Sequence, residues 1–168
     1  MKGSLQYLLL AFALFTNTDR LLAEWVQTNG PYGGCPSALV VSPDGEGGTN
    51  LFAGFYGPGA FLSTNNGTSW TASNTGLTNT DVTVFALIGT NLFAGTDGGV
   101  FLSTNNGTSW TAANAGLTTT DIRALTALAT NLFAGTDGGG VFLSTNNGTS
   151  WAATNTGLTN LKSVLLPP

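Results

Sequence analysis

The sequence predicts an all-β fold, and two observations carry this prediction. Only 7% of the residues are charged, and Gly, Thr, Asn and Ser separate short apolar runs. This is the composition of many short strands joined by tight turns. After residue 24 the apolar positions show no helical spacing of 3.6 residues. The stretch FLSTNNGTSW, moreover, occurs at residues 61–70, 101–110 and 142–151, so the fold is expected to repeat one unit.

The repeat extends well beyond these ten residues. Residues 90–110 read TNLFAGTDGGVFLSTNNGTSW, residues 130–151 differ from them only by one inserted glycine, and an earlier copy occupies residues 49–70. Successive copies are spaced by 40 or 41 residues. A period of this length indicates a solenoid, a propeller or an array.

Each repeat divides into four strand-like pieces. In the second copy these pieces are Val82–Ile88, Leu92–Gly95, Val100–Ser103 and Ser109–Ala112. The turns between them contain Asp-Gly and Asn-Gly, which supply the positive φ that tight hairpins require. Four short antiparallel strands in about 40 residues describe one blade of a β-propeller. Helical repeats are excluded by the missing helical period, and WD40 repeats by the missing Gly-His and Trp-Asp signatures.

The repeats therefore predict a partial β-propeller of about three four-stranded antiparallel blades within residues 24–168. The blades are expected roughly at residues 33–73, 80–113 and 120–154, with partial blade strands at 24–28 and 159–166. Three blades leave two apolar blade faces open. Three explanations follow: a fragment of a longer protein, a homo-oligomer that closes the ring from copies, or a curved open array.

Residues 1–23 have a different composition from the repeats. Lys2 gives a positive start, residues 5–15 are mostly apolar, and a polar stretch precedes Ala23. This pattern predicts a secretory signal peptide cleaved after Ala23. The apolar run is too short for a membrane-spanning helix, which needs about 20 residues. We expect a protein that is secreted, periplasmic or at the cell surface, with no membrane insertion after cleavage.

The charge balance narrows the possible partners. After removal of residues 1–23, two basic residues (Arg123 and Lys162) and seven acidic residues remain, a net charge of −5. Nucleic acid is excluded as a partner because phosphate binding needs clustered Lys and Arg. The chain has no histidine and one cysteine, Cys35, so we expect no zinc or copper site and no cofactor. Cys35 is expected to be a small buried residue, with an intermolecular disulfide as the alternative.

The STNNGTSW stretch resembles the Asp-box or BNR repeat, Ser-x-Asp-x-Gly-x-Thr-Trp. This repeat marks blades of sialidase-like, sortilin-like and photosystem II assembly-factor-like propellers. The matching positions are Ser63, Gly67, Trp70, Ser103, Gly107, Trp110, Ser144, Gly148 and Trp151. The departures are Asn65, Asn105 and Asn146 in place of Asp, and Ser69, Ser109 and Ser150 in place of Thr. Asn can also bond the backbone of its own turn. The resemblance implies a structural role, with each Trp packed between blades and each box away from the ligand-binding face.

Two sets of loops are expected to share the face opposite the boxes. They carry the candidate ligand-binding residues Tyr56, Asp81, Asp97, Asp121, Arg123 and Asp137. Tyr56, Asp97 and Asp137 occupy equivalent positions in the three repeats, and Arg123 is the only arginine after residue 23. These residues indicate a glycan site, a peptide site or a carboxylate site for Ca²⁺. Alternatively, Asp97 and Asp137 are turn residues, and Asp81 and Asp121 cap strand ends.

The sequence favours binding over catalysis. Without histidine, neither a Ser-His-Asp nor a Cys-His arrangement is possible. Sialidases of the resembling family use an arginine cluster, which one arginine cannot supply, and other glycosidases need two carboxylates with different pKa values. We therefore expect a non-catalytic, exported binding or scaffolding segment with an unknown protein or glycan partner. The alternatives are a fragment of a sialidase-like glycoside hydrolase with catalytic residues outside this chain, and a photosystem II assembly-factor-like protein.

Overall fold

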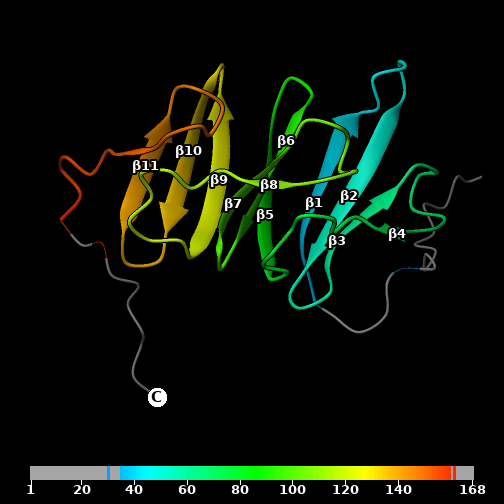
Figure 1. The fold of residues 1–168 in the computed structure, drawn as a ribbon, viewed down its shortest axis with the longest axis horizontal. Coiled ribbons are helices and arrows are strands. Elements are labelled where there is room, and N and C mark those ends of the chain that lie inside the picture. Colours follow the sequence, from blue (N-terminus) through cyan, green and yellow to red (C-terminus); the bar gives the residue numbers. More distant parts are fainter. Residues whose placement is uncertain (1–29, 31–34, 160, 162–168) are drawn as a thin grey trace, which may run out of the picture.

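The computed structural model describes residue 30, residues 35–159 and residue 161. These residues form three four-stranded antiparallel sheets, which stand side by side in sequence order (Figure 1). In each sheet the strands follow one another along the chain, as in a propeller blade. The predicted all-β, partial-propeller fold is confirmed. None of the described residues forms a helix that is long and apolar enough to cross a membrane.

We call the three sheets blades 1, 2 and 3. Blade 1 contains β1 (Pro36–Pro43), β2 (Thr49–Phe55), β3 (Gly59–Ser63) and β4 (Thr71–Ala72). Blade 2 contains β5 (Val82–Ile88), β6 (Asn91–Thr96), β7 (Gly99–Ser103) and β8 (Thr111–Ala112). Blade 3 contains β9 (Ile122–Leu128), β10 (Asn131–Thr136), β11 (Gly140–Ser144) and β12 (Ala152–Ala153).

The fourth strand of blade 2 is two residues shorter than the predicted Ser109–Ala112. The Ser109 amide is not free to pair in the sheet, because it donates to Asn105 Oδ1 within the preceding turn, at 3.0 Å. The Trp110 amide donates instead to the Thr75 carbonyl of blade 1, at 2.8 Å. Pairing with β7 therefore begins only at Thr111. The backbone of Ser109 stabilises the preceding turn, and that of Trp110 bonds the neighbouring blade.

Two expected elements fall largely outside the described residues. The predicted signal peptide (residues 1–23) and the predicted strand at 24–28 lie outside them entirely. Of the predicted strand at 159–166, only residues 159 and 161 are described, and neither is part of a strand.

The three STNNGTSW turns share one hydrogen-bond pattern. In the first, Ser63 Oγ accepts from the Gly67 amide at 2.8 Å, and Asn65 Oδ1 accepts from the Ser69 amide at 2.9 Å. The same contacts recur around Ser103 and Ser144. The asparagine at the third position thus bonds the backbone as a carboxylate would. The next residue, Asn66, has a φ of 55°, a left-handed conformation that asparagine tolerates.

The core lies between the blades. One cluster joins blades 1 and 2 and includes Phe52, Phe85 and Trp110, and a second cluster joins blades 2 and 3 around Phe93 and Trp151. Blade 2 buries both of its faces, because its strands carry apolar side chains on both sides and a neighbouring blade packs against each. The packing of blade on blade is therefore the main stabilising contact of the fold.

Each tryptophan of blades 2 and 3 anchors its blade to the preceding one. Trp110 is 3% exposed, stacks on Phe85 with ring centroids 6.3 Å apart, and donates from Nε1 to the Ser73 carbonyl at 2.7 Å. Trp151 repeats the bond to the Ala113 carbonyl at 2.7 Å. Trp110 and Trp151 thus pack between blades, as the resemblance implied, whereas Trp70 of blade 1 is only partly buried and makes no such bond within the described residues.

Cys35 does not have the burial that its residue type suggested. It is exposed and makes no disulfide within the described residues. The reason is its position: it precedes β1, outside the paired part of the sheet. The expectation of a buried small residue is wrong.

Candidate functional site

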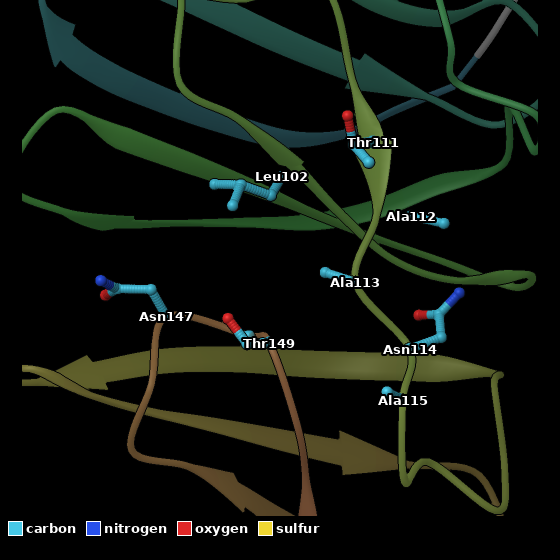
Figure 2. A pocket seen from close by; sticks show the side chains of 9 residues that line it. Leu102, Thr111, Ala112, Ala113, Asn114, Ala115, Asn147 and Thr149 are labelled. Atoms are coloured by element: carbon cyan, nitrogen blue, oxygen red, sulfur yellow. The ribbon is translucent and has the colours of Figure 1, made fainter.

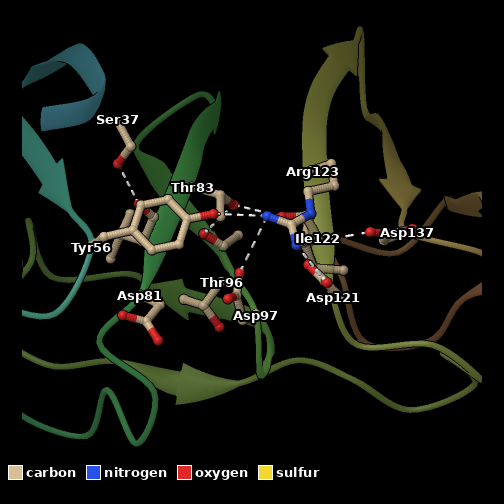
Figure 3. Close-up of polar contacts among 12 residues, drawn as sticks. Ser37, Tyr56, Asp81, Thr83, Thr96, Asp97, Asp121, Ile122, Arg123 and Asp137 are labelled. Atoms are coloured by element: carbon tan, nitrogen blue, oxygen red, sulfur yellow. Dashed lines mark hydrogen bonds and ion pairs between the residues drawn. The ribbon is translucent and has the colours of Figure 1, made fainter. Parts of the chain in front are cut away.

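Four of the six candidate residues gather around a fifth, Arg123. Arg123 lies near the start of β9 and donates to the Tyr56 hydroxyl at 2.7 Å and to Asp121 Oδ2 at 2.6 Å. The guanidinium also lies 3.7 Å from Asp97 Oδ1 and 3.9 Å from Asp137 Oδ2. Figure 3 shows these side chains converging from all three blades. The contacts connect residues that are up to 67 positions apart in the sequence.

The turns after β2, β6 and β10 present Tyr56, Asp97 and Asp137. In blade 2 the turn is held by Thr96, whose Oγ1 accepts from the Gly98 amide and donates to the Gly99 carbonyl, both at 3.0 Å. Since Thr96 bonds the turn, the Asp97 carboxylate remains available to face Arg123. Asp97 does more than fill an Asp-Gly turn, which was the alternative role.

Asp81 lies on the same face but serves a different contact. Its Oδ1 accepts from the Gly57 amide at 2.8 Å, across the joint between blades 2 and 1. Asp81 therefore braces the turn that carries Tyr56 rather than contacting Arg123. The bond fixes Tyr56 beside Arg123, although Tyr56 itself is 40% exposed.

Sequence reasoning missed two hydroxyl residues that join the blades beneath this face. The Thr83 hydroxyl lies within hydrogen-bond distance of the Gly95 carbonyl of its own blade, at 3.0 Å, and of the Ile122 carbonyl of blade 3, at 2.6 Å, and its single proton is donated to one or shared between the two. The Ser37 hydroxyl lies between the Gly54 and Val82 carbonyls in the same way. Arg123 occupies the same repeat position in blade 3. The alignment of TDVTV with TDIRA contains this substitution, which is the signal that distinguishes the third blade.

The site is electronegative. Three carboxylates, those of Asp97, Asp121 and Asp137, surround the Arg123 guanidinium, and each is about one-third exposed. The carboxylate of Asp81 lies on the same face. Burial raises the pKa of Asp97, and repulsion from Asp121 raises it further, against the opposing effect of Arg123. Burial lowers the pKa of Arg123, but attraction and hydrogen bonding by Asp121 outweigh it, so the net shift is upward. Arg123 remains charged throughout the physiological range.

Two carboxylate oxygens of the site lack hydrogen bonds. Asp97 Oδ1 and Asp121 Oδ1 are both buried and find no hydrogen-bond donor within the described part of the chain. A buried acceptor without a donor is costly. For Asp97 Oδ1 the guanidinium of Arg123, 3.7 Å away, offsets part of this cost.

A carboxylate-built metal site finds no support in the geometry. Within residues 35–159, no group of three or more His, Cys, Asp or Glu side chains is arranged to hold a metal ion. The position central to Asp97, Asp121 and Asp137 is filled by the Arg123 guanidinium, and a second cation there would meet its repulsion.

Replacing Asp97 with asparagine tests the electrostatics of the site. The folded-state pKa of Asp97 lies above its unfolded value of 3.8, so its contribution to stability is lost as the pH rises above that value. We expect Asp97→Asn to raise the melting temperature at pH 7, with the gain shrinking as the pH falls through 3.8 and below, where Asp97 becomes protonated in both states. Thermal unfolding across this range is the measurement. A difference independent of pH would contradict the electrostatic origin.

A shallow cavity of about 260 Å³ lies elsewhere, between blade 2 and the STNNGTSW turn of blade 3 (Figure 2). Its wall comes from Leu102, residues 111–115 and residues 147–149. These side chains include no titratable group. The cavity therefore offers no counterpart to the chemistry around Arg123.

Comparison with solved structures supports the same fold. Residues of this chain superpose on YCF48 from Cyanidioschyzon merolae with a TM-score of 0.61 and 16% identity, over 76% of this chain and 39% of that one. A structure of YCF48 bound to D1 peptide gives a TM-score of 0.51 and 14% identity, over 71% and 40% of the two chains. A GH74 enzyme from Niastella koreensis gives a TM-score of 0.52 and 25% identity, over 77% and 20%.

The chain thus spans about two fifths of the YCF48 structures and one fifth of the GH74 enzyme. No curated protein matches it. A family model described as the DUF6242 beta propeller domain matches residues 57–167. This match covers the end of blade 1, all of blades 2 and 3 and the segment that follows, and the chain belongs to the DUF6242 beta-propeller domain family.

Proposed function

We propose that this chain is a non-catalytic binding segment whose Arg123 face binds a peptide stretch of a partner protein carrying basic side chains. The Arg123 face consists of Tyr56, Asp81, Asp97, Asp121, Arg123 and Asp137. The observation that carries the proposal is the contact network that joins Arg123 to Tyr56 of blade 1, Asp97 of blade 2 and Asp121 of blade 3. Such a network holds these side chains in place before a ligand arrives, which lowers the entropic cost of binding.

The charges of the face favour a basic peptide. One guanidinium leaves three of the four carboxylate charges uncompensated. A lysine or arginine side chain would supply both a positive charge and donors for the exposed parts of the Asp97, Asp121 and Asp137 carboxylates. The partly exposed ring of Tyr56 offers an aromatic surface beside them.

The comparison with YCF48 gives independent support for peptide binding. One of the similar structures is bound to D1 peptide, so a propeller of related shape accepts a peptide ligand. At 14% identity this likeness concerns the fold alone. It therefore does not identify the sequence of a peptide that this chain would bind. More specifically, we propose an assembly-factor-like role, in which the chain holds a partner protein while that partner is assembled into a complex.

The cellular setting forms part of the proposal. The Asp-box assignment of the STNNGTSW turns rests on their shared bonds from Ser63, Asn65 and their counterparts. Export rests on the composition of residues 1–23. The intact mass of the chain recovered from an exporting host tests the cleavage after Ala23.

A glycoside-hydrolase fragment is the second candidate. The observation that favours it is the 25% identity to the GH74 enzyme, over one fifth of that protein. Release of reducing ends from soluble polysaccharides would support it. A chain that binds a peptide and releases none would support the binding role.

Charge reversal at Asp137 tests the binding role. The Asp137 carboxylate is about one-third exposed, and its charged partner within the described residues is Arg123 at 3.9 Å, so its replacement disturbs little of the fold. We expect Asp137→Lys to weaken the binding of a fluorescein-labelled Lys/Arg-Gly decapeptide at least tenfold, measured by fluorescence anisotropy. Binding of the same peptide should weaken as salt rises from 50 to 300 mM, because the attraction between exposed charges is screened.

Two controls accompany this experiment. Glu46→Lys makes the same charge reversal in the turn between β1 and β2, at the opposite end of blade 1 from Tyr56. It should change the dissociation constant less than twofold. Equal weakening by both variants, or equal binding of a Glu-Gly decapeptide, would overturn the assignment of the Arg123 face.

A further inference from the structure

The exposed apolar side chains lie on the two outermost blades. Among the described residues, the large exposed hydrophobic side chains besides Tyr56 are Leu39 (67%), Val41 (58%), Leu128 (67%) and Leu158 (48%). The first two belong to blade 1, and the last two to blade 3 or the segment after it. None belongs to blade 2, which is covered on both sides.

The exposed side of blade 1 carries side chains at the repeat positions that, in blades 2 and 3, pack against the preceding blade. By strand register, Leu39 opposite Ala53 corresponds to Phe85 opposite Ala94 and to Leu125 opposite Ala134. Phe85 and Leu125 are each only 8% exposed, because each packs in the joint before its blade.

Trp70 shows the same difference in burial between blade 1 and the other two blades. It occupies the position of Trp110 and Trp151, yet its side chain is only partly buried. Its Nε1 is buried but has no acceptor within the described part of the chain, whereas the other two tryptophans donate to the preceding blade.

The exposed side of blade 3 carries side chains at the repeat positions that, in blades 1 and 2, pack against the following blade. Leu158 corresponds to Leu77, which is 6% exposed in the joint between blades 1 and 2. Phe133 corresponds to Phe52 and Phe93, both fully buried, but is itself only partly buried.

The glycine that precedes each joint, Gly76 in blade 1 and Gly116 in blade 2, also contacts the following blade, whereas its equivalent in blade 3 does not. A Cβ on Gly76 or Gly116 would lie 2.2 Å from the carbonyl oxygen of the next blade's tryptophan. Gly157 takes the same left-handed conformation, with φ of +88°, and has no atom within 4 Å of that position. The docking place for a tryptophan is formed but unfilled by any described residue.

We propose that blade 1 of a second copy of this chain docks on blade 3 of the first, head to tail. The two open faces come from the same repeat, and the ten residues FLSTNNGTSW are identical in all three blades. Each face therefore has the partner that its equivalent already uses inside the chain. The joint places the backbone of Trp70 of one copy over Gly157 of the other, as the backbone of Trp110 lies over Gly76.

This joint is heterologous, because different faces of the two copies meet. It adds blades in the same direction as the chain does, so copies either close into a ring or extend as an open array. The association is driven by burial of the exposed leucines together with Phe133 and Trp70. It is independent of the peptide-binding role proposed above.

Two matched substitutions test the joint. Leu39→Lys and Leu128→Lys each place a charge on one open face, and both leucines are 67% exposed, so neither change removes a core side chain. Light scattering after size exclusion, on the chain produced from Met1 in an exporting host, should show a dimer or larger species for the unmodified chain. Either substitution should raise the dissociation constant at least tenfold. Thr111→Lys on β8 of blade 2 is the control and should leave the mass unchanged.

Mixing the two variants identifies the direction of the joint. The Leu39→Lys chain retains its blade 3 face and the Leu128→Lys chain retains its blade 1 face, so the mixture should form one heterodimer while each variant alone stays monomeric. Circular dichroism checks that both variants keep their β structure. A monomeric unmodified chain at 100 μM, variants that still self-associate, or a mixture without heterodimer would each overturn the proposal.

Discussion

Replacing Trp110 with alanine is expected to lower the free energy of unfolding by about 3–5 kcal/mol, the usual cost of truncating a buried aromatic side chain to alanine. Trp110 is 3% exposed and packs in the cluster that joins blades 1 and 2. The substitution removes the ring contact with Phe85 and leaves the Ser73 carbonyl without its donor. Urea unfolding followed by circular dichroism is the measurement.

Trp70→Ala is the matched control, because Trp70 has the same neighbours in the sequence but only partial burial. At concentrations where the chain is monomeric, it should cost less than half as much as Trp110→Ala. Trp110→Phe keeps an aromatic ring and loses the bond to Ser73, which should cost about 1–3 kcal/mol. Equal losses for Trp70→Ala and Trp110→Ala would show that the joint between blades contributes little to stability.

Replacing Gly116 with alanine should be almost as costly. Its φ of +92° is a left-handed conformation, which costs an L-residue about 1–2 kcal/mol. In addition, the new Cβ would lie 2.2 Å from the Trp151 carbonyl oxygen, so the backbone of the next blade must move. Such overpacking costs about 1–3 kcal/mol more. Thermal and urea unfolding would measure the sum.

Gly157→Ala separates the two contributions. Gly157 has a φ of +88° and open space where Gly116 meets a carbonyl. In the monomer it should lose only the conformational part, about 1–2 kcal/mol. If both variants lose the same free energy, the contact with the Trp151 carbonyl is not the constraint that the geometry indicates.

The strands and turns could be predicted from the sequence because their signals are local. Val82–Ile88 was expected as a strand from its apolar run, and β5 has these bounds. The turns followed from Asn-Gly and Asp-Gly, whose preference for positive φ depends on neither the rest of the chain nor a partner. The three copies of FLSTNNGTSW, spaced by 40 and 41 residues, then predicted three such units.

Burial was predicted less well, because it depends on what lies beside a residue in space. Cys35 has an apolar side chain but precedes the paired part of β1, and it is exposed. Leu39 and Phe85 hold the same repeat position and differ in exposure by a factor of about eight, since only one of them has a neighbouring blade among the described residues.

The sequence by itself determined the repeating four-stranded unit, its turns and the residues that could share one face, since each follows from local patterns and their phase. Only the tertiary structure decided that Arg123 bonds Tyr56 and Asp121 and lies beside Asp97, because residues 67 positions apart meet through the stacking of blades. It also decided which copies of a repeated residue are buried. That difference arises because identical sequence at the two ends of the array has different neighbours.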